Sequence, residues 1–202
     1  MRKVVGLAFA LALASSAPAV AAPTTCTGYV QDMTIAANLD VPAGATCTLV
    51  GSVVNGNVTV EGTLLSYGTR FDKNVTVTGG VITIANGNGL TSALAGNLTI
   101  TGSTAMNYIG CPNKSNIIQG NLTFTGNSGR LYVCEATVQG SVTVNDNIRV
   151  NIDWQGATVA DLNRMTVGKN LTCSGNLQSG GPVPVSGGNN TATNKLGQCA
   201  GL

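Results

Sequence analysis

The sequence predicts an all-β chain whose short strands stack into one parallel β-helix, or β-solenoid, of about eight rungs. Three observations lead to this fold class: a four-residue signature that recurs along the chain, an apolar–polar alternation inside each copy, and cysteines spaced by about one repeat. No stretch after residue 21 has a convincing helical period. A β-sandwich is the competing fold, but it would not require the same signature at near-constant intervals.

The first 21 residues have the three parts of a secretory signal peptide. Arg2 and Lys3 form a basic start, an apolar run covers residues 4–14, and residues 19–21 form an A-x-A cleavage pattern. An apolar run of this length is too short to span a bilayer. We therefore expect a secreted chain without a transmembrane segment, in which residues 22–202 form a single solenoid domain.

Removal of the signal peptide leaves a domain with no net charge. Two of the ten Lys and Arg residues lie in the signal peptide, and the remaining basic residues balance the eight Asp and Glu residues. Such a domain lacks the electrostatic footprint of nucleic-acid binding. The chain has no histidine, which excludes Ser-His-Asp and Cys-His catalysis. We expect no cofactor and no metal site.

A signature of the form Asn-apolar-Thr-apolar repeats along the mature chain. The clear copies are residues 57–60, 74–77, 97–100 and 121–124, and the looser copies are residues 38–41, 141–144 and 170–173. Successive copies lie 19, 17, 23, 24, 20 and 29 residues apart. A period near 20 residues that tolerates insertions is typical of a solenoid with loops at its corners. Asn suits such a corner because its amide can hydrogen-bond to the next rung, and we prefer this interpretation to N-glycosylation of the same sequons.

The alternation within each copy predicts which side chains face the core. Val77, Ile100 and Phe124 point inward in this register, so the flanking threonines point outward. The outward residues form Thr-x-Thr pairs on three consecutive copies: Thr76, Thr78, Thr99, Thr101, Thr123 and Thr125. Such a ladder could bind ice, a wall polymer or a second copy of the chain. The β-propensity of Thr accounts for it without any ligand.

Six cysteines in an exported chain predict three disulfides. Residues one rung apart lie about 5 Å from each other, which is within reach of a disulfide. The spacings therefore predict pairing of sequence neighbours: Cys26–Cys47, Cys111–Cys134 and Cys173–Cys199. The first and last pairs would hold the open ends of the rod, where edge strands are prone to fraying.

The longest interval between copies, residues 141–170, contains a second candidate site. It holds five closely spaced charged residues and the only tryptophan of the chain: Asp146, Arg149, Asp153, Asp161, Arg164 and Trp154. If Ile148, Val150 and Ile152 face inward, then Arg149, Asn151 and Asp153 form an outward polar stripe that could bind a sugar. The competing interpretation is a solvated stripe beside a corner loop. Residues 145–147, Asn-Asp-Asn, are a weak calcium motif.

Both ends of the mature chain resemble small secreted proteins of actinobacteria. The start carries PTTCTG at residues 23–28 and VPAGATCTL at residues 41–49. The end carries GKNLTC at residues 168–173, followed by Pro182 and by a final cysteine at residue 199. The resemblance covers the mature chain and implies a parallel β-helix and export, but it brings no catalytic residue. The chain is also similar to bactofilin-type and pectate-lyase-like solenoids, at the level of fold alone.

These observations favour one functional hypothesis with two alternatives. We expect a structural or binding β-solenoid that acts at the cell envelope or outside the cell, without catalysis, with cell-wall glycan or another envelope protein as its partner. The alternatives are a polysaccharide-acting lyase or hydrolase of the β-helix type, and ice binding through the Thr ladder. The oligomeric state is not predicted.

Overall fold

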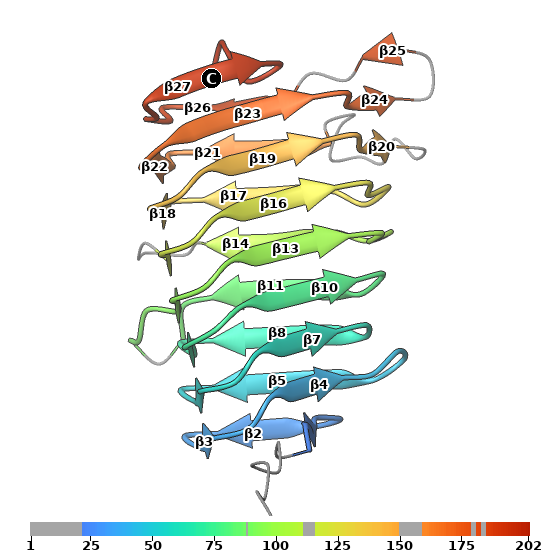
Figure 1. Ribbon diagram of the computed structural model, residues 1–202, viewed down its shortest axis with the longest axis vertical. Coiled ribbons are helices and arrows are strands. Elements are labelled where there is room, and N and C mark those ends of the chain that lie inside the picture. Colours follow the sequence, from blue (N-terminus) through green and yellow to red (C-terminus); the bar gives the residue numbers. More distant parts are fainter. Residues whose placement is uncertain (1–21, 88, 111–115, 150–158, 179–180, 183–184) are drawn as a thin grey trace, which may run out of the picture.

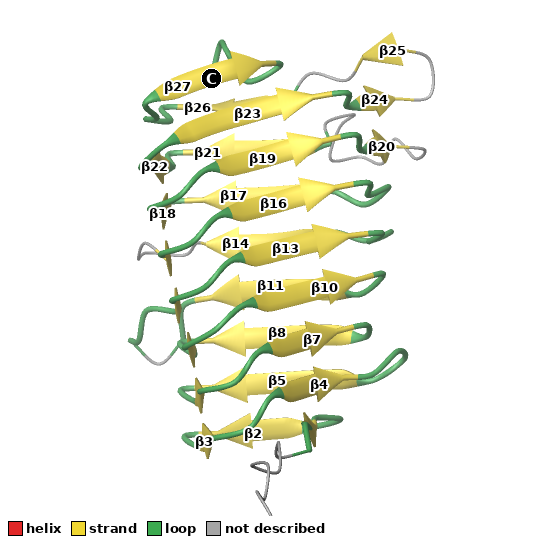
Figure 2. Cartoon of the chain, in the orientation of Figure 1, coloured by secondary structure: helices red, strands yellow, loops and turns green. Residues whose placement is uncertain are grey.

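The computed structural model describes residues 22–87, 89–110, 116–149, 159–178, 181–182 and 185–202, and these form a three-sided solenoid (Figure 1). Each of the first seven turns of the chain contributes one strand to each of three sheets, so consecutive strands of a sheet are one rung apart. The described residues include no helix, and the strands of the three sheets pair in parallel (Figure 2). The predicted all-β parallel solenoid is therefore confirmed over the β-sandwich.

Sheet A has nine strands and is the face toward the viewer in Figure 1. Its strands are β1 (Thr24–Thr25), β4 (Leu39–Val41), β7 (Val58–Val60), β10 (Val75–Thr78), β13 (Leu98–Thr101), β16 (Leu122–Thr125), β19 (Val142–Asn145), β23 (Asn170–Ser174) and β27 (Asn194–Gly197). The copies of the Asn-x-Thr signature thus form this one face.

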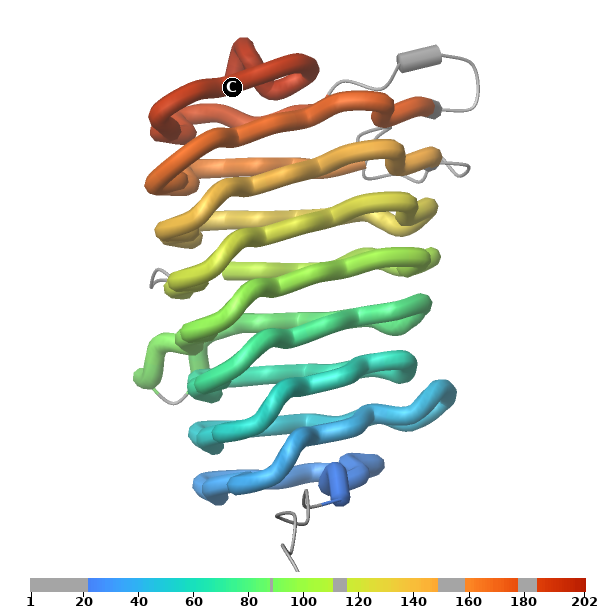
Figure 3. Tube along the Cα trace, viewed as in Figure 1, coloured from blue at the N-terminus to red at the C-terminus, as the bar shows by residue number. Residues whose placement is uncertain are grey.

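Sheets B and C complete the cross-section with eight and seven strands. Sheet B contains β2 (Tyr29–Gln31), β5 (Thr46–Val50), β8 (Thr63–Tyr67), β11 (Val81–Ala85), β14 (Asn107–Gly110), β17 (Leu131–Cys134), β21 (Ala160–Asn163) and β26 (Ser186–Gly188). Sheet C contains β3 (Thr34–Ile35), β6 (Val53–Val54), β9 (Arg70–Phe71), β12 (Ala93–Leu94), β15 (Asn116–Ile118), β18 (Ala136–Val138) and β22 (Thr166–Val167). The tube in Figure 3 shows the turns stacked in chain order from the N-terminal to the C-terminal end.

A small fourth sheet lies outside the cylinder and is called the flap here. Its strands β20 (Ile148–Arg149), β24 (Leu177–Gln178) and β25 (Gly181–Pro182) protrude at the upper right of Figure 1, beyond β19 and β23. The strands β20 and β24 are parallel, and β25 runs antiparallel to β24. The flap therefore adds a local wall beside the corner that joins sheets A and B.

The core consists of columns of inward side chains that stack along the solenoid axis. Val77, Ile100 and Phe124 are fully buried and lie opposite one another in the register of β10, β13 and β16. The predicted inner and outer faces are thus confirmed. Each such side chain contributes on the order of 1.5–3 kcal/mol through removal of apolar surface from water.

Asparagines connect successive rungs at the corner between sheets C and A. The backbone N–H of Asn57 donates to Oδ1 of Asn38 at 2.9 Å, and the same bond recurs at each following rung up to Ser141. The outer Asn ladder, as we call it, contains the exposed residues Asn38, Asn57, Asn74, Asn97 and Asn121. The predicted role of Asn as a link between rungs is confirmed.

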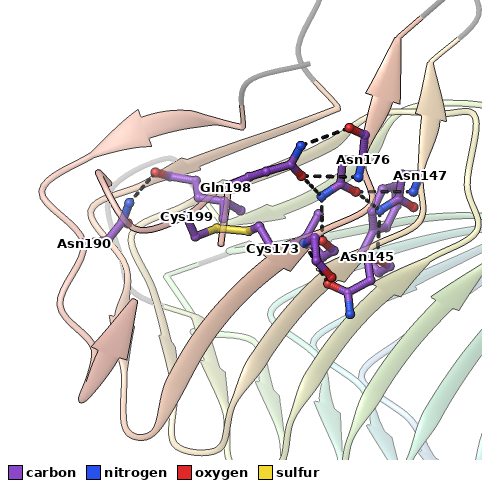
Figure 4. Close-up of a disulfide and its surroundings, with 11 residues drawn as sticks. Asn145, Asn147, Cys173, Asn176, Asn190, Gln198 and Cys199 are labelled. Carbon is purple, nitrogen blue, oxygen red and sulfur yellow. Dashed lines mark hydrogen bonds between the residues drawn. A yellow bond between two sulfur atoms is a disulfide. The ribbon is translucent and has the colours of Figure 1, made fainter. Parts of the chain in front are cut away.

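A second ladder of amides lies inside the opposite corner, between sheets A and B. This inner Asn ladder consists of Asn127, Asn147, Asn176 and Gln198. Its three asparagines are buried, whereas those of the outer ladder are exposed. Figure 4 shows how Asn147, Asn176 and Gln198 face one another beside the C-terminal disulfide. The sequence analysis did not predict this ladder.

Two disulfides lie among the described residues, where the sequence predicts three. Cys26 and Cys47 are bonded with their Cα atoms 5.4 Å apart, and Cys173 and Cys199 with theirs 5.2 Å apart. Each joins neighbouring rungs at one end of the rod, so these two pairings are confirmed. Cys134 is buried, but its predicted partner Cys111 lies outside the described residues, and this third bridge stays a prediction.

Candidate functional site

The predicted threonines come together on the outer surface of sheet A. Thr76, Thr99 and Thr123 lie opposite one another on β10, β13 and β16, and Thr78, Thr101 and Thr125 form a second column beside them. All six side chains are exposed or partly exposed. The Thr-x-Thr pairs of the sequence therefore form two parallel rows of hydroxyl and methyl groups.

The first column is longer than the sequence analysis proposed. Thr59 extends it on β7, and Thr143 and Thr172 extend it on β19 and β23, so one residue type occupies six successive strands. The second column continues as Asn145 and Ser174. The signal was present in the sequence, because every copy from Thr59 to Thr172 has Thr at its third position. We call the two columns together the threonine face.

The strand residues of the threonine face are uncharged and regularly spaced, although the exposed Glu61 follows β7 at the level of the second column. From β7 to β23 the outward residues of sheet A are Thr, Ser and Asn, and the first column ends against Asp40 on β4 and Leu196 on β27. Parallel strands place equivalent side chains about 4.8 Å apart. Thr is β-branched and has restricted χ1 freedom, so the rows are stiff. The face therefore suits a neutral partner that also repeats at regular intervals.

Sheet B presents different chemistry. All four tyrosines of the sequence lie in its strands: Tyr29 in β2, Tyr67 in β8, Tyr108 in β14 and Tyr132 in β17. The rings of Tyr108 and Tyr132 stack with centroids 5.1 Å apart. Burial, together with the neighbouring Tyr132 hydroxyl, raises the pKa of Tyr108 above its ordinary value. Aromatic groups thus gather on one face and threonines on another.

The register that predicted the polar stripe is wrong at Ile148. Ile148 was expected to face inward, but its side chain is 52% exposed. The reason is that β20 belongs to the flap and not to one of the three sheets around the core. Arg149 lies in β20, and Asn151 and Asp153 fall outside the described residues, as does Trp154. The stripe itself therefore stays a prediction, but the alternation on which it was based does not hold at Ile148.

A cleft lies along the corner between sheets A and B, where the flap begins. It has a volume of about 370 Å³ and is lined by Gly102, Gly126, Asn127, Ser128, Asp146 and Ile148. Gly102, Gly126 and Asp146 each follow the last residue of a sheet A strand, on three successive rungs. The cleft is therefore continuous with the edge of the threonine face. We call it the corner cleft.

Asp146 has a left-handed backbone, which is the rule in this corner but unusual for a residue other than glycine. Its φ is 54°, in the left-handed region, where the corresponding residues of the neighbouring rungs are the glycines Gly102, Gly126 and Gly175. The left-handed conformation costs a residue with a Cβ atom about 1–2 kcal/mol, although Asp and Asn tolerate it better than most. The carboxylate of Asp146 lies over Gly175, where a Cβ atom would collide with it. Asp146 is thus accommodated by the glycine of the next rung.

The Asn-Asp-Asn motif around Asp146 is not arranged as a calcium site. Oδ1 of Asn147 accepts hydrogen bonds from Asn127 in the inner ladder, and Oδ1 of Asn145 accepts from the N–H of Ser174. Among the described residues, no group of three or more Asp, Glu, Cys or His side chains is placed to hold a metal ion. No helix in the described part of the chain is long and apolar enough to cross a membrane.

Two ion pairs among the described residues near this end of the rod lie on sheet B and its border with sheet C. Arg130 pairs with Asp161, and Arg164 pairs with Glu135 at 2.7 Å. Glu135 and Arg164 both have a positive φ, because each stands at the left-handed position of its corner. Asp161 and Arg164, which the sequence grouped with Asp146, are therefore structural partners of residues on other rungs.

Comparison of the chain with protein-family models, with curated protein sequences and with solved structures finds no match in any of the three. The geometry of the threonine face and of the corner cleft is therefore the basis for a functional proposal.

Proposed function

We propose that this chain is an exported, non-enzymatic β-solenoid that acts at the cell envelope as a rigid binding module. Its partner is a neutral wall glycan, or an envelope protein, that contacts the threonine face. One observation carries the proposal: six threonines stand in register on six successive strands, β7 to β23, whose outward residues are uncharged. A stiff, repetitive surface of this kind loses little side-chain entropy when it binds.

The low charge of the face bears on the class of partner. A charged polymer would be attracted by rows of opposite charge, and the outward positions within the strands β7 to β23 of sheet A supply none. Glu61, directly after β7, is a single charge at one end of the second column. Hydroxyl groups that donate and accept hydrogen bonds, alternating with methyl groups, match a neutral polysaccharide instead. The resemblance of both chain ends to small secreted actinobacterial proteins is in keeping with a role at the envelope.

The test compares two triple variants that introduce the same charge on different faces. Thr78→Lys, Thr101→Lys and Thr125→Lys change the threonine face, whereas Thr34→Lys, Thr137→Lys and Thr166→Lys change sheet C. Both variants should stay folded by circular dichroism, because substitutions at exposed sites usually cost little. We expect insoluble chitin or cellulose to retain the wild type and the sheet C variant but not the threonine-face variant. Equal retention of all three proteins would refute the proposal.

A polysaccharide-acting lyase or hydrolase is the alternative, and it depends on Arg149, Asn151 and Asp153. Paired carboxylates perform acid–base chemistry in many such enzymes. Incubation of the purified protein with pectin, alginate and wall glycans tests this directly. Turnover that is lost on Asp153→Ala would establish the enzyme and overturn the non-enzymatic proposal.

The length of the first threonine column favours ice binding as a second candidate. A flat lattice of hydroxyl and methyl groups can order water as well as a glycan, and the column covers six rungs instead of the three found in the sequence. Inhibition of ice recrystallisation by the wild type, lost in the threonine-face variant and kept in the sheet C variant, would favour this candidate over glycan binding.

A further inference from the structure

We propose that the corner cleft is a saccharide subsite that holds one neutral sugar residue of the glycan contacted by the threonine face. The inference rests on the proposed function, because it names the chemical class of that partner. It also goes further than the proposed function. The cleft contains a carboxylate, that of Asp146, which can bind sugar hydroxyls, whereas the threonine face provides only a repetitive surface.

The position of the cleft links it to the threonine face. Thr101 is followed directly by Gly102, Thr125 by Gly126, and Asn145 by Asp146, so the lining begins where the second column ends. A chain that lies on sheet A can thus place one of its units in the cleft. The volume of about 370 Å³ is at the small end of the range for ligand sites, which suits one ring better than several.

The lining groups match the groups of a sugar ring. The Asp146 carboxylate is an acceptor with two oxygens that can receive two neighbouring hydroxyls, and the Ser128 hydroxyl can donate or accept. Ile148 offers an apolar wall for the C–H face of the ring, since about half of its side chain is exposed. No heavy atom lies within 4 Å of the place where a Cβ of Gly126 would stand, so the floor of the cleft is open.

The backbone indicates that folding does not require an acidic residue at position 146. Glycine occupies the same corner position on neighbouring rungs and adopts the left-handed conformation at no steric cost. A glycine in place of Asp146 would therefore relieve strain and fit the corner. Among the three left-handed positions that line the cleft, Asp146 alone is not a glycine, and it places a carboxylate there.

Asp32 provides a matched control for this argument. It also has a left-handed backbone, with φ 51°, and its carboxylate lies over Gly51 of the next rung as that of Asp146 lies over Gly175. Asp32 stands at the corner between sheets B and C and is not part of the cleft lining. The substitutions Asp146→Gly and Asp32→Gly thus have the same backbone effect, and only the first removes a group from the cleft.

The experiment measures binding of cellohexaose, chitohexaose and maltohexaose to the full mature chain by isothermal titration calorimetry. We expect the wild type to bind at least one of them, and Asp146→Gly and Asp146→Asn to weaken that affinity by about tenfold or more, which is the loss of one charge-assisted hydrogen bond. Asp146→Gly should melt at the same temperature as the wild type or higher. Asp32→Gly should bind as the wild type does.

The result that overturns the inference is unchanged affinity in Asp146→Gly, or an equal loss in Asp32→Gly. Retention on the insoluble glycans, measured in parallel, separates this failure from that of the proposed function. Suppose that insoluble glycan retains the wild type but not the threonine-face variant, while Asp146→Gly keeps full affinity for the oligosaccharide. The proposed function of the threonine face is then supported and the cleft proposal is refuted. If neither insoluble glycan nor oligosaccharide binds the wild type, both proposals fall.

Discussion

The two Asn ladders use the same side chain at opposite corners of the solenoid, and they differ in burial. In the outer ladder, Oδ1 of one Asn accepts the N–H of the next rung while its side chain stays in water. In the inner ladder the equivalent atoms are fully buried. Water can replace a lost partner in the first case but not in the second, so the same substitution should have very different consequences.

The inner ladder also satisfies backbone groups of the core strands. Nδ2 of Asn127, Asn147 and Asn176 donates to the carbonyl oxygens of Ile100, Phe124 and Val144 on the rung below. These bonds have lengths of 3.1, 3.0 and 2.7 Å. The amide nitrogen of each inner Asn therefore donates both to the side chain on the next rung and to a backbone carbonyl on the rung below. The buried corner depends on them in a way that the exposed corner does not.

The largest effect is expected from Asn147→Leu. This change leaves the N–H of Asn127 and the carbonyl of Phe124 buried without their partner. An unsatisfied buried group costs about 1–3 kcal/mol, so the free energy of unfolding should fall by about 3 kcal/mol or more. Urea unfolding, followed by circular dichroism, measures it. A loss no larger than that of Asn97→Leu in the outer ladder would show that burial does not distinguish the two.

Removal of the C-terminal disulfide should have the next largest effect. Cys173→Ala with Cys199→Ala opens a loop of 26 residues, for which the chain-entropy estimate is about 3 kcal/mol. Gln198, which closes the inner ladder on Asn176, is the direct neighbour of Cys199. Thermal unfolding of this variant and of Cys26→Ala with Cys47→Ala compares the two ends. We expect the C-terminal variant to lose at least as much stability as the N-terminal variant. A smaller loss in the C-terminal variant would show that its disulfide does not support the inner ladder.

A smaller effect is expected for Asn97→Ala. The substitution removes the acceptor of the Asn121 N–H and the donor to Asn74, both at the surface. Because water can take their place, the free energy of unfolding should fall by only about 0.5–1.5 kcal/mol. Denaturant unfolding at constant m-value measures it. A cost as large as that of Asn147→Leu would mean that the outer ladder is a cooperative unit.

The smallest effect concerns pH, to which neither amide ladder responds. The pKa of Tyr108 is raised in the folded state by burial and by Tyr132, so the folded chain holds this proton more tightly than the unfolded chain. Its contribution to stability is complete below about pH 10, the ordinary value for Tyr, and declines as the pH rises through the folded pKa. Tyr108→Phe should therefore reduce the fall in melting temperature above pH 10. An identical alkaline profile in both proteins would contradict this.

The two ladders also show what could be predicted from sequence. The outer ladder was recognised because Asn begins a repeated four-residue signature. The inner asparagines follow the signature at a constant distance of six residues, from Asn121 to Asn127 and from Asn170 to Asn176, but the polar residues around them indicated only turns. A buried Asn and an exposed Asn give the same pattern in sequence, because periodicity records which residues are apolar and not which polar groups are enclosed.

Alternation also failed at Ile148, and for a related reason. A period of two residues distinguishes the faces of a strand, but it carries no information on whether that strand belongs to the cylinder. The chain turns at the left-handed Asp146 after β19, and the following strand β20 belongs to the flap. Ile148 therefore lines the corner cleft instead of the core. The cleft itself could not be foreseen, since its lining residues come from three rungs.

The sequence by itself determined the repeat that makes sheet A, the inward and outward faces of its strands, and the two confirmed disulfides between neighbouring rungs. These features depend on local alternation and on a period, which are properties of the chain order. The tertiary structure alone decided the three-sided cross-section, the burial of the inner ladder and the place of the flap. These depend on how loops of unequal length close at each corner, and that is settled only when each rung packs on the one before it.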